Sequence, residues 1–435
     1  MILAPLLILI CSLFILLIIG VPIFVSLGLS SIITFMTTAH MPMAIIAQKF
    51  YSNIFSVPLM AVPFFLLTSS LMEYSGLSQR IINLADAIVG RVRGNLAITG
   101  VVACMLFSSI SGSSLATVAG IGSILMPRML EQGYDRRLAI GSIAAAGTLG
   151  ILIPPSVPLI IYSMVTGTSV LKLFLAAIVP AVLLSLAFIV TAIFFINKGN
   201  FSQDAVIATW RERRKKFREG VWTLLIPLGI FIGIYGIPGV TSAIFTATEA
   251  AVVSFFLAIF VGTFIYREFQ FKEIPKVITE STSHIGMILI IVATAMLFSF
   301  VVNNAGIPQT IADFLVDIHL SKVAFLLIVN LLLFIAGQFM DAVPIIMIFI
   351  PVLFPAAMAL GIDPVHFGIL TVVNMELGCI TPPVGLNLYM ASNITNLSLV
   401  EVTKTVLPWI LVIVFVLFVI TYVPALSLWL PNIAH

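Results

Sequence analysis

The sequence predicts an all-α polytopic membrane protein built from two related halves. Its 435 residues are 61% hydrophobic and 9% charged, with a mean hydropathy of +1.23, whereas about a quarter of an ordinary soluble domain is charged. Two apolar stretches, 138–168 and 365–394, are each interrupted by a Pro-Pro pair. Proline removes backbone donors, and broken backbone persists in a bilayer only where it lines a buried cavity. The pair of breaks therefore predicts a paired binding site.

The two halves are visible as a self-match. When the chain is shifted so that Pro154 aligns with Pro382, LMPRMLEQGYD (125–135) aligns with LFPAAMALGID (353–363), and Pro180 aligns with Pro408. So many turn-forming residues in one register predict an internal duplication. We expect a first repeat over 1–197, a basic cytoplasmic linker over 198–220 and a second repeat over 221–435.

The first half begins with an uncharged stretch, 2–37, that is too long for one untilted helix. We expect either two spans or one bent span there, with a break near Gly20-Val21-Pro22. A further span is expected at about 54–72. Residues 78–94 predict an amphipathic surface helix because their apolar side chains recur at helical spacing. Its basic residues place it on the cytoplasmic side by the positive-inside rule: Arg80, Arg91 and Arg93.

No charged residue occurs between Asn95 and Pro127, and both flanks of this stretch are basic. A segment with two cytoplasmic ends is a re-entrant hairpin, so we expect one over 95–127 with its small, polar tip at 109–114. The broken helix 138–168 should then cross outward, and 173–197 should return. The basic run Arg211–Arg218 marks the cytoplasm and faces water or lipid headgroups.

The second half predicts spans at 221–236 and 240–265, joined by the turn Gly236–Gly239, and a span at about 284–303. The next surface segment, 307–320, carries Asp313 and Asp317 where its counterpart carries arginines. This reversal predicts repeats of inverted topology. A second hairpin over 323–354 has its tip at 337–344, and the broken helix 365–394 and a span at 405–430 follow. The total is about ten spans and two hairpins, with the C-terminus outside.

Inverted repeats with hairpins and broken helices are typical of secondary transporters. Helix N-termini at a break favour anions, and unwound carbonyls with hydroxyls are the hard ligands that Na⁺ prefers. We therefore predict two sodium sites. The first is Ser109, Ser111, Gly112, Ser113, Gly147, Thr148, Gly150 and Pro154. The second is Gly337, Met340, Asp341, Gly378, Thr381, Pro382 and Gly385. Candidate substrate-binding residues are Ser114, Gln338, Asn374 and Asn387.

Each of these residues also has a structural interpretation. Small residues let membrane helices pack closely, and a serine often bonds back to a carbonyl. Asp341 and Glu376 are stronger candidates because intramembrane carboxylates are functional by default, although Glu376 could be a structural pair or a proton site. Glu249 is expected to make a helix contact. His284, His319 and His366 are expected to be interfacial.

No lysine or arginine lies within the apolar segments to neutralise an anionic substrate. Helix N-termini, hydroxyls, amides and bound cations would have to do so, which favours cation-coupled uptake of an anion. Cysteine and histidine show no metal-ligand spacing. We expect no cofactor, no metal other than Na⁺ as the coupling ion, no enzymatic activity and no nucleic-acid binding.

Several motifs resemble those of the large membrane subunit of tripartite ATP-independent periplasmic (TRAP) transporters. They are SISGSSLATVAGIGSILMPRM, GTLGILIPPSVPLIIYSMVTGTSV, GIDPVHFGIL and TPPVGLNLYMAS. The resemblance implies a multi-pass protein of the bacterial inner membrane that imports organic acids, such as C4-dicarboxylates or sialic acid, driven by sodium. It also implies an elevator-type carrier with two partners, a small four-helix membrane subunit on a separate chain and a periplasmic substrate-binding protein.

Three alternatives remain at this stage. A stand-alone sodium/dicarboxylate symporter of the divalent-anion type would share the architecture but lack the two partners. An intramembrane protease would need a Ser–His dyad or two intramembrane aspartates, and the apolar segments supply neither. A passive channel would not need two related broken-helix sites.

Overall fold

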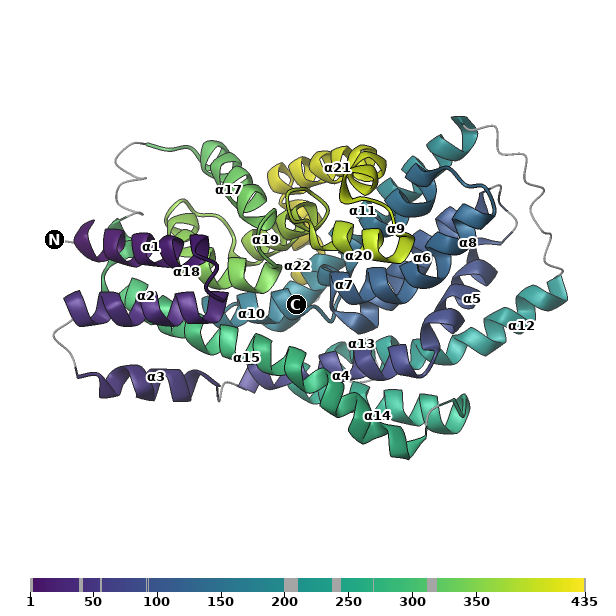
Figure 1. Cartoon of the computed structure of the whole chain (residues 1–435), viewed down its shortest axis with the longest axis horizontal. Helices are drawn as coiled ribbons and strands as arrows, with labels where there is room; N and C mark the ends of the chain where they lie inside the picture. The colour runs from purple at the N-terminus through teal and green to yellow at the C-terminus, as the bar shows by residue number, and fades with distance from the viewer. Residues whose placement is uncertain are drawn as a thin grey trace.

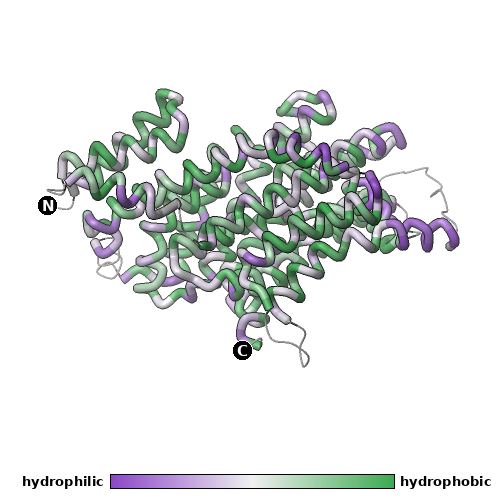
Figure 2. The backbone as a smooth tube through the Cα atoms, turned by 90° about the horizontal axis from the view of Figure 1, so that it is seen from below, coloured by the Kyte–Doolittle hydropathy of each residue, from purple (hydrophilic) through white to green (hydrophobic). Residues whose placement is uncertain are grey.

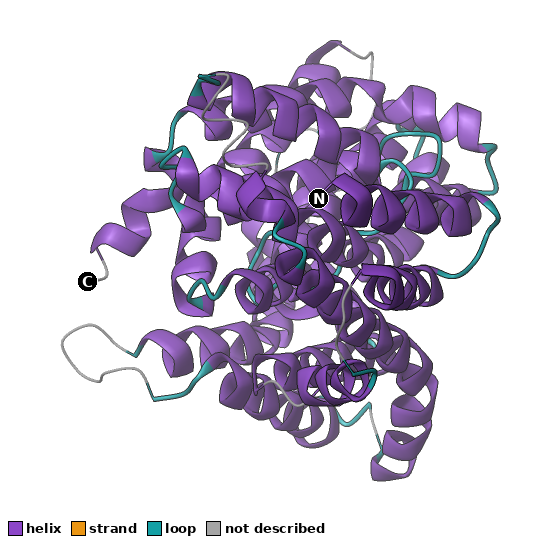
Figure 3. Cartoon of the chain, turned by 90° about the vertical axis from the view of Figure 1, so that its left-hand side faces the viewer, coloured by secondary structure: helices purple, strands orange, loops and turns teal. Residues whose placement is uncertain are grey.

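The computed structural model describes residues 3–38, 42–54, 57–90, 92, 94–198, 210–236, 244–268, 270–310 and 319–433. Within these ranges the regular structure is helical and no strand occurs (Figure 3). The all-α expectation is therefore confirmed. The predicted sidedness of two surface segments rested on charged residues that lie outside the described ranges: Arg91, Arg93, Asp313 and Asp317. Residues 199–209 of the linker and 237–239 of the predicted turn also lie outside them.

Seven helices pack on one another along one side of the molecule and are here called the outer set (Figure 1). They are α1 (Leu3–Ile18), α2 (Ile23–Thr38), α3 (Ala44–Ile54), α4 (Ala61–Tyr74), α13 (Leu225–Tyr235), α14 (Ala247–Phe260) and α15 (Ile274–Asn304). A 3₁₀ turn, Val57–Met60, precedes α4, and a π-helical turn, Val261–Ile265, extends α14. Helix α15 crosses α2, α3 and α4 and so ties this set together.

Most of the remaining helices form a second group, here called the hairpin set. They are α6 (Asn95–Ser111), α7 (Ser114–Thr117), α8 (Ser123–Glu131), α9 (Ser142–Gly147), α10 (Val157–Thr166), α11 (Val170–Lys198), α17 (Lys322–Gly337), α18 (Ala342–Ala359), α19 (Pro364–Cys379), α20 (Leu386–Thr395), α21 (Leu399–Tyr422) and α22 (Ala425–Ile433). Two further helices, α5 (Leu77–Val89) and α12 (Trp210–Gly220), pack on each other.

Seven helices in the described ranges are long and apolar enough to cross a bilayer, and six shorter apolar helices accompany them. The expectation of about ten spans rested on apolar runs, which continue through backbone breaks. The uncharged N-terminal stretch, for example, is two helices, because Gly20 takes a positive φ of 86° and Pro22 cannot donate to a helical bond.

Two predicted spans have different ends in the structure. Helix α15 begins at Ile274 rather than near residue 284, because its polar first turns continue the helix although they do not continue the apolar run. Its 31 residues reach about 46 Å, beyond a hydrocarbon core of about 30 Å. The last predicted span, 405–430, ends at Tyr422, since the chain turns at Pro424 and α22 folds back against α11.

Both Pro-Pro pairs interrupt helices. The first lies between the 3₁₀ turn Thr148–Ile151 and α10, and the second lies between α19 and α20. Element boundaries in the two halves keep the spacing seen in the sequence. In the first half, one helical run covers 114–131 and comprises α7, a π-helical turn (Val118–Gly122) and α8. In the second half, α18 covers 342–359. Both ends of this pair differ by the same shift that aligns Pro154 with Pro382.

The hairpin tips pack directly against the breaks. A Cβ on Gly150 would lie 2.6 Å from the carbonyl carbon of Ser113, and a Cβ on Gly112 would lie 2.8 Å from the carbonyl oxygen of Pro155. In the second half, a Cβ on Gly378 would lie 2.6 Å from Cα of Gly337. Only glycine permits this backbone approach.

Replacing Gly378 by alanine should therefore lower the thermal midpoint of the purified protein, because overpacking against backbone costs about 1–3 kcal/mol. Gly286→Ala is the matched control, since no atom lies within 4 Å of a Cβ at that helical glycine. Thermal unfolding in detergent compares the two variants. Equal midpoints would show that the second tip and break are not in backbone contact.

Candidate ion and substrate site

A small pocket lies where the two hairpin tips and the two breaks meet. Its volume is about 60 Å³. The hairpin set supplies most of its wall, and α4 and α15 of the outer set supply the rest. The lining residues are Leu66, Gly112, Ser113, Ser114, Leu115, Ile151, Val157, Pro158, His284, Ile288, Asp341, Ala342, Val343, Cys379 and Leu386. Residues from both halves of the sequence thus converge on one site.

At the first tip, Ser113 caps the helical run that starts at Ser114. Its hydroxyl accepts from the backbone N–H of Ala116 at 3.4 Å. Its carbonyl accepts from the Thr117 hydroxyl at 2.9 Å and from the Ser111 hydroxyl at 3.3 Å. The Ser111 and Thr117 hydroxyls lie 2.9 Å apart. The tip therefore presents a compact set of hydroxyl and carbonyl oxygens beside Gly150.

Thr117 is part of this oxygen cluster and was not predicted. The sequence argument considered only the polar tip 109–114 and ignored the next helical turn. The signal was available, because a residue four positions after the cap Ser113 lies above it on the same helix face.

At the second tip, Asp341 occupies the capping position that Ser113 has at the first, in the register that aligns the two halves. Its Oδ1 accepts from the backbone N–H of Ala342 at 2.8 Å. The Gln338 carbonyl accepts from the N–H of Val384 at 3.1 Å, which joins the tip to the second break. The Thr381 hydroxyl donates to the Leu377 carbonyl at 2.6 Å. The helix N-terminus at this tip thus carries a carboxylate, whereas that of the first tip carries a hydroxyl.

His284 faces Asp341 from α15 and was not predicted to belong to the site. His284 and Asp341 both line the pocket. The sequence placed His284 at a membrane surface because the apolar run begins at the next residue. The early start of α15 instead carries this histidine to the interface between the two sets.

The two halves are joined beside the pocket by Ser114 and Asn387. The Ser114 hydroxyl lies 2.8 Å from Nδ2 and 3.0 Å from Oδ1 of Asn387, and the amide also donates to the Ala144 carbonyl at 3.2 Å. All these side-chain groups are buried. Ser114 lines the pocket, while Asn387 lies behind it and positions Ser114.

Asn374 lies in a separate buried network. Its amide donates to Asn330 Oδ1 at 2.6 Å, and Asn330 donates to the Thr421 hydroxyl at 3.1 Å. His366, which was expected to be interfacial, is only 2% exposed, and its Nδ1 lies 2.7 Å from the Ser427 hydroxyl. This network joins α17, α19, α21 and α22, so Asn374 does not line the pocket.

Two other carboxylates differ in their surroundings. Glu376 in α19 is completely buried, and neither of its oxygens has a hydrogen-bond partner among the residues that the structure describes. Cys379, three residues further along α19, lines the pocket. Glu249 instead accepts from the N–H of Thr246 at 2.8 Å in a capping box at the start of α14. Glu249 has a local structural role.

The remaining predicted ligands lie behind the pocket, around the two contacts between tip and break. Ser109 and Thr148 donate to the carbonyls of Leu106 and Ala145 at 2.6 and 2.7 Å, so their hydroxyl protons are used locally. The predicted residues that line the pocket are Gly112, Ser113, Ser114 and Asp341. Those that are not part of its lining are Ser109, Ser111, Gly147, Thr148, Gly150, Pro154, Gly337, Gln338, Met340, Gly378, Thr381, Pro382, Gly385 and Asn387.

A family model described as "Tripartite ATP-independent periplasmic transporter, DctM component" matches residues 10–426. The chain belongs to this family. It is 44% identical to the C4-dicarboxylate TRAP transporter large permease protein DctM of Pseudomonas aeruginosa, an alignment that covers 94% of each chain. It is 41% identical to the protein of the same name from Rhodobacter capsulatus, over 95% of this chain and 96% of the relative.

Among solved structures, the chain is similar to the YdaH transporter of Alcanivorax borkumensis, described as having an unusual topology. The TM-score is 0.60 at 17% identity, over 89% of this chain and 87% of the other. This likeness concerns the fold. The TRAP resemblance noted in the sequence is thus confirmed at the level of the family, and the chain is a multi-pass membrane protein.

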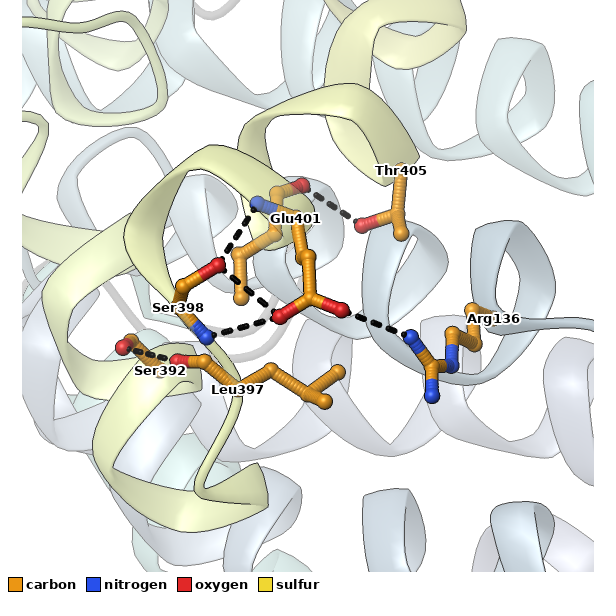
Figure 4. Close-up of polar contacts among 7 residues, drawn as sticks. Arg136, Ser392, Leu397, Ser398, Glu401 and Thr405 are labelled. Atoms are coloured by element: carbon orange, nitrogen blue, oxygen red, sulfur yellow. Dashed lines mark hydrogen bonds and ion pairs between the residues drawn. The ribbon is translucent and has the colours of Figure 1, made fainter.

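A second contact between the halves lies near the start of α21 in this TRAP permease (Figure 4). Ser398 and Glu401 form a capping box, and Arg136 approaches the Glu401 carboxylate at 3.2 Å. Both charged side chains are about half exposed, so the ion pair contributes little to stability. Ser398 does not line the pocket and thereby provides a control for the cap at Ser113.

Asn387→Ala should lower the thermal midpoint, because it leaves the buried Ser114 hydroxyl and Ala144 carbonyl without this amide, at a cost of about 1–3 kcal/mol. Asn303→Ala removes an exposed asparagine that bonds Ser299 within its own helix and should change stability by about 0.5 kcal/mol or less. Thermal unfolding of both variants checks this. A midpoint for Asn387→Ala as high as that for Asn303→Ala would contradict the joining role of Asn387.

Proposed function

We propose that this chain is the large permease subunit of a sodium-coupled TRAP transporter that imports an organic acid, with a C4-dicarboxylate as the favoured substrate. It acts as a carrier and not as an enzyme, in the bacterial inner membrane. A small four-helix membrane subunit and a periplasmic substrate-binding protein complete the system. The names of the two relatives support the substrate class, and family membership supports the two partners.

The observation that carries the sodium coupling is the position of Asp341 in the pocket. A dicarboxylate entering beside an aspartate would be repelled, since like charges about 4 Å apart interact at about 4 kcal/mol in a partly buried site. His284 offsets at most one of these charges. A bound cation beside Asp341 removes the repulsion and makes substrate affinity depend on the cation.

The oxygen clusters at the two tips are suited to Na⁺. The first offers the Ser113 carbonyl with the Ser111 and Thr117 hydroxyls. The second offers the Asp341 carboxylate, which carbonyls of the second break would complete in this proposal. Hydroxyl, carbonyl and carboxylate oxygens are the donors that hard cations prefer. No cluster of three histidine, cysteine or acidic side chains occurs in the described part of the chain, which leaves these oxygens as the candidate ligands.

The size of the pocket supports a moving carrier. About 60 Å³ accommodates an ion and a few water molecules, whereas small-molecule pockets are roughly 300–1,000 Å³. A dicarboxylate fits only if the hairpin set moves away from α4 and α15. We propose that the outer set is the scaffold and that the hairpin set moves against it as an elevator, with inverted repeats giving the two end states.

Uptake of labelled C4-dicarboxylates into proteoliposomes tests the proposal. The chain is reconstituted with a small subunit and a binding protein encoded beside it, under an inward sodium gradient. Uptake should require sodium and the binding protein. Sodium-driven uptake without the binding protein would favour the stand-alone symporter. Uptake that needs no sodium and stops at equal concentrations on the two sides would favour a channel.

Asp341→Asn should reduce this uptake while the protein still inserts and folds. Asparagine keeps the helix cap but removes the charge, and the loss of a charged interaction of about 1.5–3 kcal/mol corresponds to about ten- to a hundredfold. The initial uptake rate is measured at equal protein content.

Asp363→Asn is the matched control, since Asp363 caps α19 through the N–H groups of Val365 and His366 and lies outside the pocket. It should transport at the normal rate. Equal rates for the two variants would remove Asp341 from the site.

Ser113→Ala and Thr381→Ala should each raise the sodium concentration that gives half-maximal uptake. Each substitution keeps the backbone carbonyl but removes a hydroxyl bond that holds the tip or the break in place, between Ser113 and Ala116 or between Thr381 and Leu377. A loss of about 1 kcal/mol corresponds to about fivefold. Ser398→Ala also removes a helix cap but lies away from the pocket, so it should leave the sodium dependence unchanged. Unaltered sodium dependence in both test variants would argue against two sodium sites at the tips.

A further inference from the structure

A second pocket lies away from the transport site, between α12, α5 and the end of the helical segment that contains α14. Its volume is about 440 Å³. The lining residues are Arg80, Lys215, Arg218, Glu219, Trp222, Ile265 and Tyr266. Figure 2 shows the hydrophilic helix α12 at the right-hand end of an otherwise apolar molecule.

Only some of the basic residues of α12 attach this helix to the rest of the protein. Lys216 pairs with Asp86 of α5 at 2.6 Å. The Arg213 guanidinium donates to the carbonyls of Ala87 and Ile88 at the end of α5. These contacts fix α12 on α5 and form one wall of the pocket.

The cations that line the pocket have weaker partners. Lys215 is 76% exposed and lies 3.9 Å from Glu219 one turn away, a geometry that contributes little. Arg218 makes no ion pair within the described ranges. Lys215 and Arg218 are three residues apart and so lie on one helix face. Among the described residues, this face offers positive charge that is only partly neutralised.

Arg80 closes the inner end of the pocket. Its guanidinium pairs with Glu268 and lies 4.0 Å from the centre of the Tyr266 ring. Its Nε is buried without a hydrogen-bond partner among the described residues. Because Glu268 pairs with Arg80, the lining retains Lys215 and Arg218 against Glu219, which is an excess of positive charge.

The opposite wall is apolar. Trp222 is 46% exposed, and Ile265 ends the apolar segment Ala247–Ile265, which is long enough to span a bilayer. Trp222 lies in the turn between the charged helix α12 and the apolar helix α13 (Leu225–Tyr235), within another such segment. The pocket therefore lies at the end of two spans, where aromatic side chains and lipid headgroups meet. Its basic residues place it at the cytoplasmic leaflet.

We propose that this pocket binds an anionic glycerophospholipid. The phosphodiester lies between Lys215 and Arg218, and the glycerol and first acyl carbons lie on Trp222 and Ile265. A basic pocket at the cytoplasmic ends of membrane helices has the chemistry for such headgroups. A free phosphate would use the cations but would leave the apolar wall exposed. The bound lipid links the linker helix α12 to the outer set, independently of the transport proposal.

The test compares lipids on the delipidated full-length protein in a neutral detergent. Phosphatidylglycerol, phosphatidylcholine and inorganic phosphate are added separately, and the thermal midpoint is recorded. Native mass spectrometry counts the lipids that stay bound. Phosphatidylglycerol should raise the midpoint and remain bound, whereas the other two should do neither.

The double variant Lys215→Ala/Arg218→Ala should lose most of that increase in midpoint and the bound lipid. The matched control is Arg211→Ala/Arg214→Ala, which removes the same charge from the same helix outside the pocket and should behave like the original protein. Equal responses to phosphatidylglycerol and phosphatidylcholine, or equal losses in both double variants, would overturn the site. An equal response to phosphate would overturn it as well, because the pocket would then bind soluble anions instead.

Discussion

The structure depends on the satisfaction of backbone groups that the two Pro-Pro breaks release inside a bilayer. Hydrocarbon provides no water to pair with them, so each break is covered by a hairpin tip. Gly150 lies on the Ser113 carbonyl, Gly378 lies on Gly337, and Val384 bonds Gln338. Because these contacts are backbone to backbone, they place carbonyl oxygens and helix N-termini at one point. The constraint that makes the breaks tolerable thereby also gathers the oxygen atoms on which the proposed ion sites rest.

Differences between the two halves matter as much as their similarity. The cap position at the first tip is Ser113, and the equivalent position of the second half is Asp341. Thr148 bonds back to its own helix, while Glu376 at the corresponding position is buried with neither oxygen paired in the described structure. A carboxylate that replaces a hydroxyl changes the charge balance of the pocket. Under the proposed sodium coupling, the second half supplies the carboxylates that would make substrate binding sensitive to cations.

Much of the fold follows from local rules, and the residues that the sequence misplaced show where those rules end. Helix breaks follow from proline chemistry, and the tips follow from small polar residues between uncharged runs. His284 was placed at a surface because hydropathy measures the apolar run and not the helix, which begins earlier, at Ile274. Asn374 was expected in the substrate site because it is polar and intramembrane, but its amide donates to Asn330 in a buried network that does not line the pocket.

By itself, the sequence determined that the chain is helical and membrane-embedded, that its two halves repeat in one constant register, and which backbone segments cannot continue as helices. Composition, periodicity and proline act locally, so they can be read without a structure. Only the tertiary structure decided which groups share the pocket. Ser114 of the first half bonds Asn387 of the second, and α15 brings His284 to Asp341. Such pairings depend on how helices pack against one another, and side-chain packing between distant segments leaves no periodic trace in the sequence.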